Sequence, residues 1–378
     1  MAIGNGNTVW ILGAGFSRSL GGPLLADLFR PRAIEDDEAL FPKDKYPNLS
    51  RDLNMTRCLY CAGQDEGRWD NAEQFLSYMD GAYGTDRGHQ RTIIKNLEHR
   101  LQGRPGNHLP LYPSIVMGMT LVEEYQRIAK RAFAAQIAEF LLDIHDDDER
   151  WWPYRKWCST LEPHRDTIIS LNYDLVLEKL DGTRMCVVLP NETRGAARDK
   201  VRVLKLHGSI DWQEVNGSIT SALSERLLAA EDRSPLIAAP GRSKTAAVGT
   251  TLKPLWDMAL QALRQADAIV MLGYSFPQTD AGARMSLLGA IGGAEPGCFV
   301  RRIDIVMGPD TARSDIRRVQ SLAEACRNGR FLTSGQPRKI RSGSESGNRH
   351  LLVEVQPLWA EDFIADYTMR LSDFRCDG

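Results

Sequence analysis

The chain has 378 residues, of which 43% are hydrophobic, so it is long enough to bury a large core and to form two or three structural units. Its formal net charge is −2, with 47 basic and 49 acidic residues, which argues against non-specific binding to nucleic acid or to an anionic membrane. No secretory signal pattern, membrane-spanning run or disulfide pattern is recognisable, so we expect a cytoplasmic protein with free thiols.

Six short apolar runs predict the strands of a parallel sheet. Each run is rich in Val, Ile and Leu and lacks strict alternation, as expected for strands buried on both faces. Helical stretches such as Leu252–Ala266 lie between several of them, which favours an α/β, doubly wound, Rossmann-like fold. The predicted strands are Thr8–Leu12, Thr167–Leu171, Val201–Leu206, Ala268–Leu272, Ile303–Met307 and Leu351–Val355.

The long segment between the first two predicted strands has helical spacing. We therefore expect a discontinuous core, residues 1–40 and 160–310, that is interrupted by a helical insertion at residues 41–159. Residues 311–378 form a C-terminal segment in which a polar linker, Thr333–Asn348, precedes a final strand and helix. The helical signals in the insertion are strongest in Asn71–Tyr83, Gln90–Leu101 and Leu121–Ile144.

The first predicted strand is followed by Gly13-Ala14-Gly15-Phe16-Ser17. Glycines at a turn from strand to helix let the backbone approach a pyrophosphate, whose charge is met by N–H groups at the start of the helix. The third glycine of the full dinucleotide fingerprint is replaced by Arg18, so a tight turn without a ligand is an equal alternative for this segment alone.

The second predicted strand leads into Asn172, Tyr173 and Asp174. Polar side chains at the carboxyl end of a strand point into the crevice where α/β folds hold ligands, and an amide can both donate to and accept from a ribose hydroxyl or a water. A turn or a helix cap is the alternative for Asn and Asp at such a position.

The third predicted strand ends at His207, followed by Gly208 and Ser209. Histidine exchanges a proton near neutral pH, and the glycine behind it permits a close backbone approach. Taken alone, a buried structural histidine is the commoner explanation.

The fourth predicted strand is followed by Gly273, Ser275 and, a turn later, Asp280. Backbone and hydroxyl donors there are suited to the adenylate half of a dinucleotide, with an ordinary strand-to-helix turn as the alternative. Because carboxyl ends of parallel strands share one edge of a sheet, we expect all four segments to meet at one site.

In this order, GAGFS, SLNYD, LKLHGS and LGYSF with a following Asp resemble the signature series of sirtuin-like domains, in particular the NAD-hydrolysing branch of bacterial anti-phage defence proteins. The resemblance covers Thr8 to about Arg30 and Arg165 to about Met307. It implies Asn172, His207 and Asp174 as catalytic residues. It implies NAD contacts for Gly13, Ala14, Gly15, Ser17, Gly22, Pro23, Gly208, Gly273, Ser275 and Asp280.

The implied activity is cleavage of the nicotinamide–ribose bond of NAD to give nicotinamide and ADP-ribose, with NAD as substrate and no metal. Deacylases of the family carry two C-x-x-C pairs after the histidine motif, whereas residues 210–267 here contain no cysteine and only Cys58 and Cys61 form such a pair. The acidic run His145–Glu149 fits a solvated turn better than a nuclease metal site.

The resemblance also implies a role in depleting NAD during anti-phage defence, which requires control of the activity. We expect control by homo-oligomerisation or by a partner such as a HerA-type hexameric ATPase, without membrane association or sequence-specific nucleic-acid binding. An NAD-dependent deacylase or ADP-ribosyltransferase, and a non-catalytic NAD or ADP-ribose sensor, stay open as alternatives. The sequence does not decide between hydrolysis and cyclisation.

Overall fold

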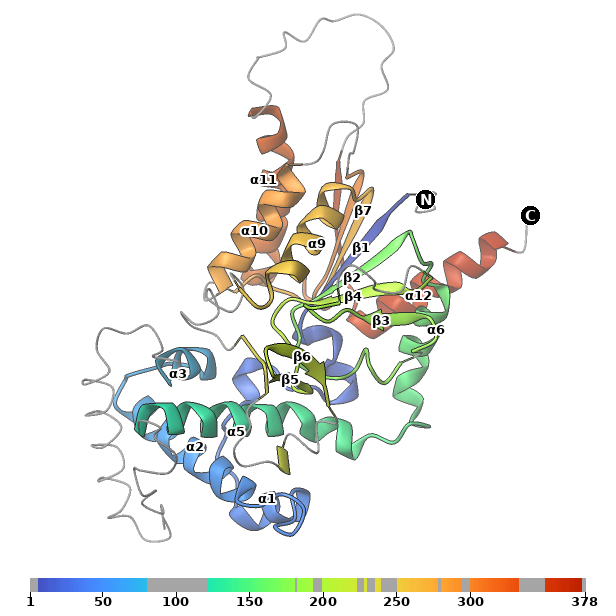
Figure 1. The fold of residues 1–378 in the computed structure, drawn as a ribbon. Helices are drawn as coiled ribbons and strands as arrows, with labels where there is room; N and C mark the ends of the chain where they lie inside the picture. The colour runs from blue at the N-terminus through green and yellow to red at the C-terminus, as the bar shows by residue number, and fades with distance from the viewer. Residues whose placement is uncertain are drawn as a thin grey trace, which may run out of the picture.

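The protein is built on a parallel sheet of seven strands, in the order β3-β4-β2-β1-β7-β8-β9 (Figure 1). The computed structural model describes residues 6–79, 121–180, 182–192, 199–222, 228–229, 235–238, 250–277, 280–293, 300–332 and 351–375. The sheet strands are β1 Thr8–Leu12, β2 Asp166–Ser170, β3 Met185–Val187, β4 Val201–Lys205, β7 Ala268–Leu272, β8 Arg302–Val306 and β9 Leu352–Gln356.

The predicted α/β fold with a parallel sheet is confirmed, and all six predicted strands are present within one residue at each end. Three further strands were not predicted: β3, and the antiparallel hairpin of β5 Trp212–Val215 and β6 Ser218–Ser221. The strand β3 has only three residues. The hairpin turn, Asn216-Gly217, has positive φ at both positions, as a two-residue hairpin turn requires.

Successive residues of β1 face opposite layers of helices, as the two-residue period of a strand demands. Val9 and Ile11 pack into a core with the helices α9 Lys253–Arg264, α10 Ala281–Gly292 and α11 Ser314–Leu332. Trp10 and Leu12 pack into a second core, which includes α6 Trp152–Thr160 and α12 Ala360–Arg375 on the other face (Figure 1). Because both faces are covered at the centre of the sheet, the central strands β1 and β7 are buried along their whole length and almost entirely apolar.

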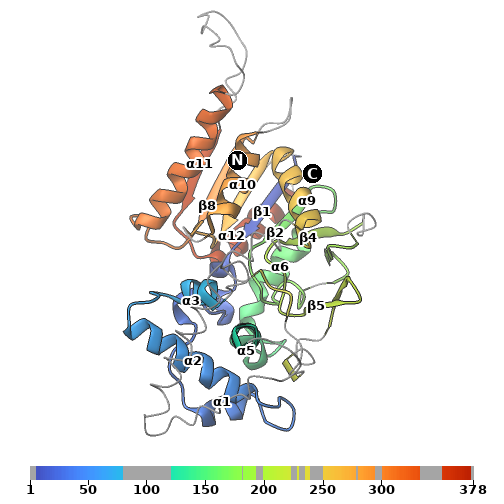
Figure 2. The same cartoon turned by 60° about the vertical axis from the view of Figure 1, so that its left-hand side comes forward.

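A third core lies beyond the carboxyl ends of the strands (Figures 1 and 2). It is formed largely by three helices, α2 Leu49–Asp65, α3 Ala72–Met79 and α5 Leu121–Asp143, and the short helix α1 Ile34–Leu40 packs against α2. Within it, Phe75 of α3 packs edge-on against Phe29 with ring centroids 5.4 Å apart, and Arg131 of α5 forms a buried ion pair with Asp52 at 2.7 Å. This helical layer faces the edge of the sheet.

The helices predicted at Asn71–Tyr83 and Leu121–Ile144 correspond to α3 and α5. The predicted helix Gln90–Leu101 and the predicted linker Thr333–Asn348 lie outside the described residues. The division into a core and an inserted domain stays a prediction. The C-terminal segment contributes both β9 to the sheet and α12 to one of its faces. No helix in the described ranges is long and apolar enough to cross a membrane.

Candidate functional site

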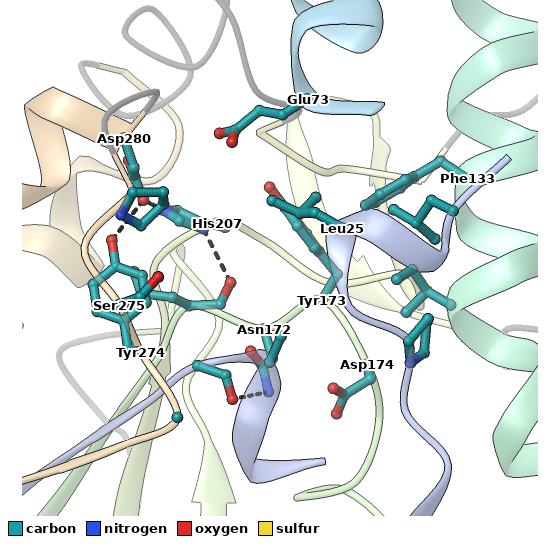
Figure 3. A pocket seen from close by; sticks show the side chains of 18 residues that line it. Leu25, Glu73, Phe133, Asn172, Tyr173, Asp174, His207, Tyr274, Ser275 and Asp280 are labelled. Carbon is teal, nitrogen blue, oxygen red and sulfur yellow. Dashed lines mark hydrogen bonds and ion pairs between the residues drawn. The ribbon is translucent and has the colours of Figure 1, made fainter. Parts of the chain in front are cut away.

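A cavity lies where the strand order places β2 and β4 on one side of β1 and β7 and β8 on the other. Such a reversal opens a crevice at the carboxyl edge of a doubly wound sheet. One wall consists of the four segments that follow β1, β2, β4 and β7, as the sequence predicted (Figure 3). We call this the sheet wall. The opposite wall is formed by the segment from Pro23 to Leu28 and by α3 and α5, and we call it the helical wall.

The glycines after β1 and β7 allow the turns that follow these two strands to pack closely against each other. A Cβ atom on Gly13 would lie 2.6 Å from the Gly273 carbonyl oxygen, and one on Gly15 would lie 2.6 Å from the Gly273 Cα. Gly273 also has a φ of 67°. The N–H groups of Gly13 and Gly15 donate to the carbonyl oxygens of Leu272 and Gly273 at 2.9 and 3.1 Å. Among these residues, Gly13, Ala14 and Gly273 line the cavity.

The turn after β1 continues into two short 3-10 turns, Ala14–Phe16 and Arg18–Leu20, and the first α-helix begins only at Ile34. The α-helix start that we expected beside a pyrophosphate is therefore absent from this turn. The contact of residues 13–17 with phosphates stays a prediction, and the observed role of Gly15 is in backbone packing.

Asn172 lies at the centre of the sheet wall and is buried. Its Nδ2 donates to the Gly13 carbonyl oxygen at 3.0 Å (Figure 3). It also donates to the Ser17 Oγ at 3.2 Å. Because the carbonyl can only accept, the amide nitrogen must face it, and this fixes the orientation of the side chain. The Oδ1 atom is therefore the hydrogen-bonding group that Asn172 offers to a ligand.

Asp174 and Ser17 hold the segment after β2 against the turn after β1. The Ser17 hydroxyl donates to Asp174 Oδ2 at 2.7 Å, and Asp174 Oδ1 accepts from the Val176 N–H at 3.1 Å. Asp174 lines the cavity, whereas Ser17 is buried behind it. Next along the chain, Pro23 lines the cavity, whereas Gly22 lines a neighbouring, arginine-containing cavity.

His207 is buried with both ring nitrogens in contact with protein oxygens (Figure 3). Its Nδ1 lies 3.0 Å from the Leu171 carbonyl oxygen, and its Nε2 lies 3.3 Å from Asp280 Oδ2. Since a carbonyl oxygen can only accept, Nδ1 carries a proton in this contact, and Nε2 faces the Asp280 carboxylate. The two contacts place the ring between the segments that follow β2 and β7.

Gly208 does not line the cavity, and its role is in the backbone. Its φ is 79°, and a Cβ atom there would lie 2.1 Å from the Leu236 carbonyl oxygen. The neighbouring Ser209 N–H donates to that same oxygen at 3.1 Å, and the Ala238 N–H donates to the His207 carbonyl at 2.8 Å. The segment 236–238 thus fixes the backbone on both sides of Gly208.

The segment after β7 places Ser275 and Asp280 at the cavity. Asp280 immediately precedes α10, and its Oδ2 accepts from the Tyr274 hydroxyl at 2.7 Å as well as contacting His207. Arg318 of α11 donates to the carbonyl oxygens of Ser275 and Phe276, both at 2.8 Å. Phe276 has a positive φ of 49°, so these two bonds stabilise an unfavourable turn.

Two polar residues near the site were not predicted. Lys205, which is buried at the end of β4, donates to the Asp174 carbonyl at 2.6 Å, to Ser209 Oγ at 2.7 Å and to Glu178 Oε1 at 2.8 Å. It therefore ties together two segments of the sheet wall. A lysine at the end of an apolar strand is a signal that sequence reasoning could have used. The other residue is Glu73 in the first turn of α3. Nothing in the sequence around it indicates that it faces a cavity.

No group of three or more His, Cys, Asp or Glu side chains within the described ranges could hold a metal ion. Cys58 and Cys61 both lie on α2 as free thiols, and burial raises the pKa of Cys61. In the acidic run, Asp148 caps the 3-10 turn Glu149–Trp151 by accepting from the Arg150 N–H at 2.9 Å. Asp148 therefore has a structural role as the cap of this turn.

No protein-family model matches the chain, and no curated protein matches it.

Proposed function

We propose that the chain is an NAD glycohydrolase with a sirtuin-like core, which cleaves the nicotinamide–ribose bond and releases nicotinamide and ADP-ribose. The observation that supports this proposal best is the meeting of Asn172, His207 and Asp280 at one cavity at the switch point of the sheet. A fixed amide lies beside a histidine–carboxylate pair at that edge of the sheet. Chemistry on a ribose explains this arrangement better than a purely structural role in a turn does.

In the proposed reaction, the bond between ribose C1′ and the pyridinium nitrogen breaks, and its electron pair stays on nicotinamide, which leaves as a neutral molecule. The oxygen of a water then bonds to C1′, and the water loses a proton. Asn172 Oδ1 accepts a hydrogen bond from a ribose hydroxyl and so orients the sugar. The developing positive charge on the ribose is stabilised by the carboxylates of the cavity.

His207 takes the proton only if its Nε2 is neutral and turned toward the substrate. In the structure this atom lies 3.3 Å from Asp280 Oδ2, so the proposal requires bound NAD or its attacking water to separate the two side chains. Catalytic contacts often change in this way when the substrate binds. Once separated, Asp280 remains near enough to stabilise the imidazolium that forms.

The same contact favours a second candidate function, a non-catalytic NAD or ADP-ribose sensor. If His207 and Asp280 stay paired when the ligand is bound, the histidine is a structural group and the cavity only binds. Defence against phage, homo-oligomerisation and control by a HerA-type ATPase stay proposals that follow from the resemblance alone.

The test is to incubate the purified chain with NAD and to measure nicotinamide and ADP-ribose by chromatography. We expect nicotinamide release from the wild type and a loss of about 100-fold or more in His207→Ala and in Asn172→Ala. Arg264→Ala, an exposed change at the far end of α9, serves as the control that keeps activity. Tight NAD binding without any release would support the sensor.

Nicotinamide release that is equal in all four proteins would place the reaction elsewhere and refute the proposed site. Release that requires an acyl-lysine peptide would instead support the deacylase alternative.

A further inference from the structure

Glu73 reaches the cavity from the helical wall and belongs to none of the four strand-end segments. It lies in the first turn of α3, is 5% exposed, and points into the cavity toward His207 and Asp280 (Figure 3). Among the described residues that line the cavity, Glu73 is the charged group that the helical wall contributes.

The charges around the cavity are predominantly negative. Glu73, Asp174 and Asp280 line it, and no described lysine or arginine does so. The arginines nearby, Arg18, Arg30 and Arg32 among them, line the neighbouring cavity and pair with carboxylates such as Asp27 and Glu139. A phosphate placed directly beside Glu73 would be repelled, whereas a cationic group would be attracted.

Aromatic side chains complete this environment. Tyr173, Tyr274 and Phe133 line the cavity, and Phe133 packs edge-on against Tyr173 with ring centroids 5.2 Å apart. Burial, together with the charges of Asp280 and Glu73, raises the pKa of Tyr173 and Tyr274 well above its ordinary value, so both phenols are neutral. Carboxylates beside neutral aromatic faces form the kind of surroundings that recognise a cationic ring.

From this arrangement we infer that Glu73 is a specificity-determining residue that recognises the positive charge of the oxidised nicotinamide ring, so that the cavity binds NAD⁺ in preference to NADH. The inference rests on the proposed NAD site and adds the group that selects the redox form. The pyridinium of NAD⁺ carries a unit charge, and the dihydropyridine of NADH carries none. The remaining parts of the two dinucleotides are the same, so only a contact with the ring can distinguish them.

The experiment measures binding by calorimetry of carba-NAD⁺, which keeps the pyridinium but resists cleavage, and of NADH and ADP-ribose. Wild type is compared with Glu73→Gln, which keeps the size of the side chain and removes its charge. Glu35→Gln, an exposed change on α1, is the matched control. We expect wild type to bind carba-NAD⁺ at least about 10-fold more tightly than NADH, and Glu73→Gln to lose most of that ratio while its Kd for ADP-ribose changes less than about twofold.

Unchanged ADP-ribose binding shows that the variant is folded, and the wild-type ratio tests the inference even if Glu73→Gln does not fold. Equal wild-type affinities for carba-NAD⁺ and NADH, or equal weakening of all three ligands in Glu73→Gln, would overturn it. Preferential binding of carba-NAD⁺ without nicotinamide release would retain the inference and refute the hydrolase. Nicotinamide release from NAD, together with an unchanged carba-NAD⁺ to NADH affinity ratio in Glu73→Gln, would support the hydrolase and refute the role of Glu73. If wild type bound none of the three ligands, both would be wrong.

Discussion

The two walls of the cavity are built by different means. On the sheet wall, hydrogen bonds to the backbone fix the side chains that we propose to be catalytic: Asn172 is held by the Gly13 carbonyl and His207 by the Leu171 carbonyl. On the helical wall, Leu25, Phe133 and Ile137 are apolar, and Glu73 is the charged group among the described residues. The sheet wall therefore suits positioning of reacting groups, and the helical wall suits exclusion of water and selection of the ligand.

This difference shows where the site tolerates change. Replacing one donor or acceptor of the sheet wall is expected to cost both stability and activity, because its partner is left buried without a hydrogen bond. A packed apolar wall loses function more gradually, through shape and affinity.

The largest effect on folding is expected at the turns that support the sheet wall. In Gly273→Ala the added Cβ would lie 2.4 Å from the Gly15 Cα, at a residue whose φ is positive. We expect the free energy of unfolding to fall by about 3 kcal/mol, measured by chemical denaturation. Gly289→Ala in α10 is the control, because its Cβ would have nothing within 4 Å. Equal stability of the two variants would contradict the close approach of the turns.

On the same wall, Asn172→Asp keeps the size of the side chain but places an acceptor against the Gly13 carbonyl. We expect nicotinamide release to fall about 100-fold, which corresponds to about 2.7 kcal/mol of activation free energy. Thermal melting of the same protein separates a loss of activity from a loss of fold. Full activity in a folded Asn172→Asp protein would show that the amide nitrogen has no positioning role.

Glu178, beneath the sheet wall, gives the stability of the protein a dependence on pH. Burial raises the pKa of Glu178 to about 7 despite the attraction of Lys205, from an ordinary value of 4.5. The folded state therefore holds a proton that the unfolded state has lost, and this contribution to stability falls as the pH rises from about 4.5 to 7.

Glu178→Gln removes this titration. Relative to wild type, we expect its free energy of unfolding to increase by about 1–3 kcal/mol between pH 4.5 and pH 7.5. Denaturation at several pH values measures this difference. A difference that stays constant, or that shrinks as the pH rises, would contradict the raised pKa.

The smallest effect is expected on the helical wall. Phe133→Leu keeps an apolar surface but removes the edge-on contact with Tyr173. We expect KM for NAD to rise about threefold with kcat nearly unchanged, because the residue shapes the site without contacting the reacting atoms. A fall in kcat as large as that of Asn172→Asp would mean that the two walls do not differ as described.

The sheet wall could be predicted from the sequence because its signals are local. Buried strands are continuous apolar runs, and parallel pairing brings their carboxyl ends together, so Asn172, His207 and Asp280 were placed at one edge without a structure. What could not be predicted is which atoms they contact. The pairing of His207 with Asp280 depends on how the segment after β7 folds back, and Gly15 and Gly208 proved to serve backbone packing.

The helical wall was harder to predict, because its contribution depends on tertiary packing. Glu73 lies on a helix whose pattern shows an apolar face and nothing about the cavity it meets. The hairpin β5–β6, in contrast, had a readable signal in Asn216-Gly217. Lys205 was visible as a lysine within an apolar strand end, but its three acceptors come from segments that only the fold brings together.

The most direct test of the proposed site is a crystal structure of the chain with carba-NAD⁺. We predict that the nicotinamide ribose lies within hydrogen-bonding distance of Asn172 Oδ1 and that the ring lies beside Glu73. We also predict that His207 Nε2 lies farther from Asp280 Oδ2 than the present 3.3 Å. A dinucleotide bound away from this cavity, or bound there with the His207–Asp280 contact intact, would contradict the proposed catalytic role.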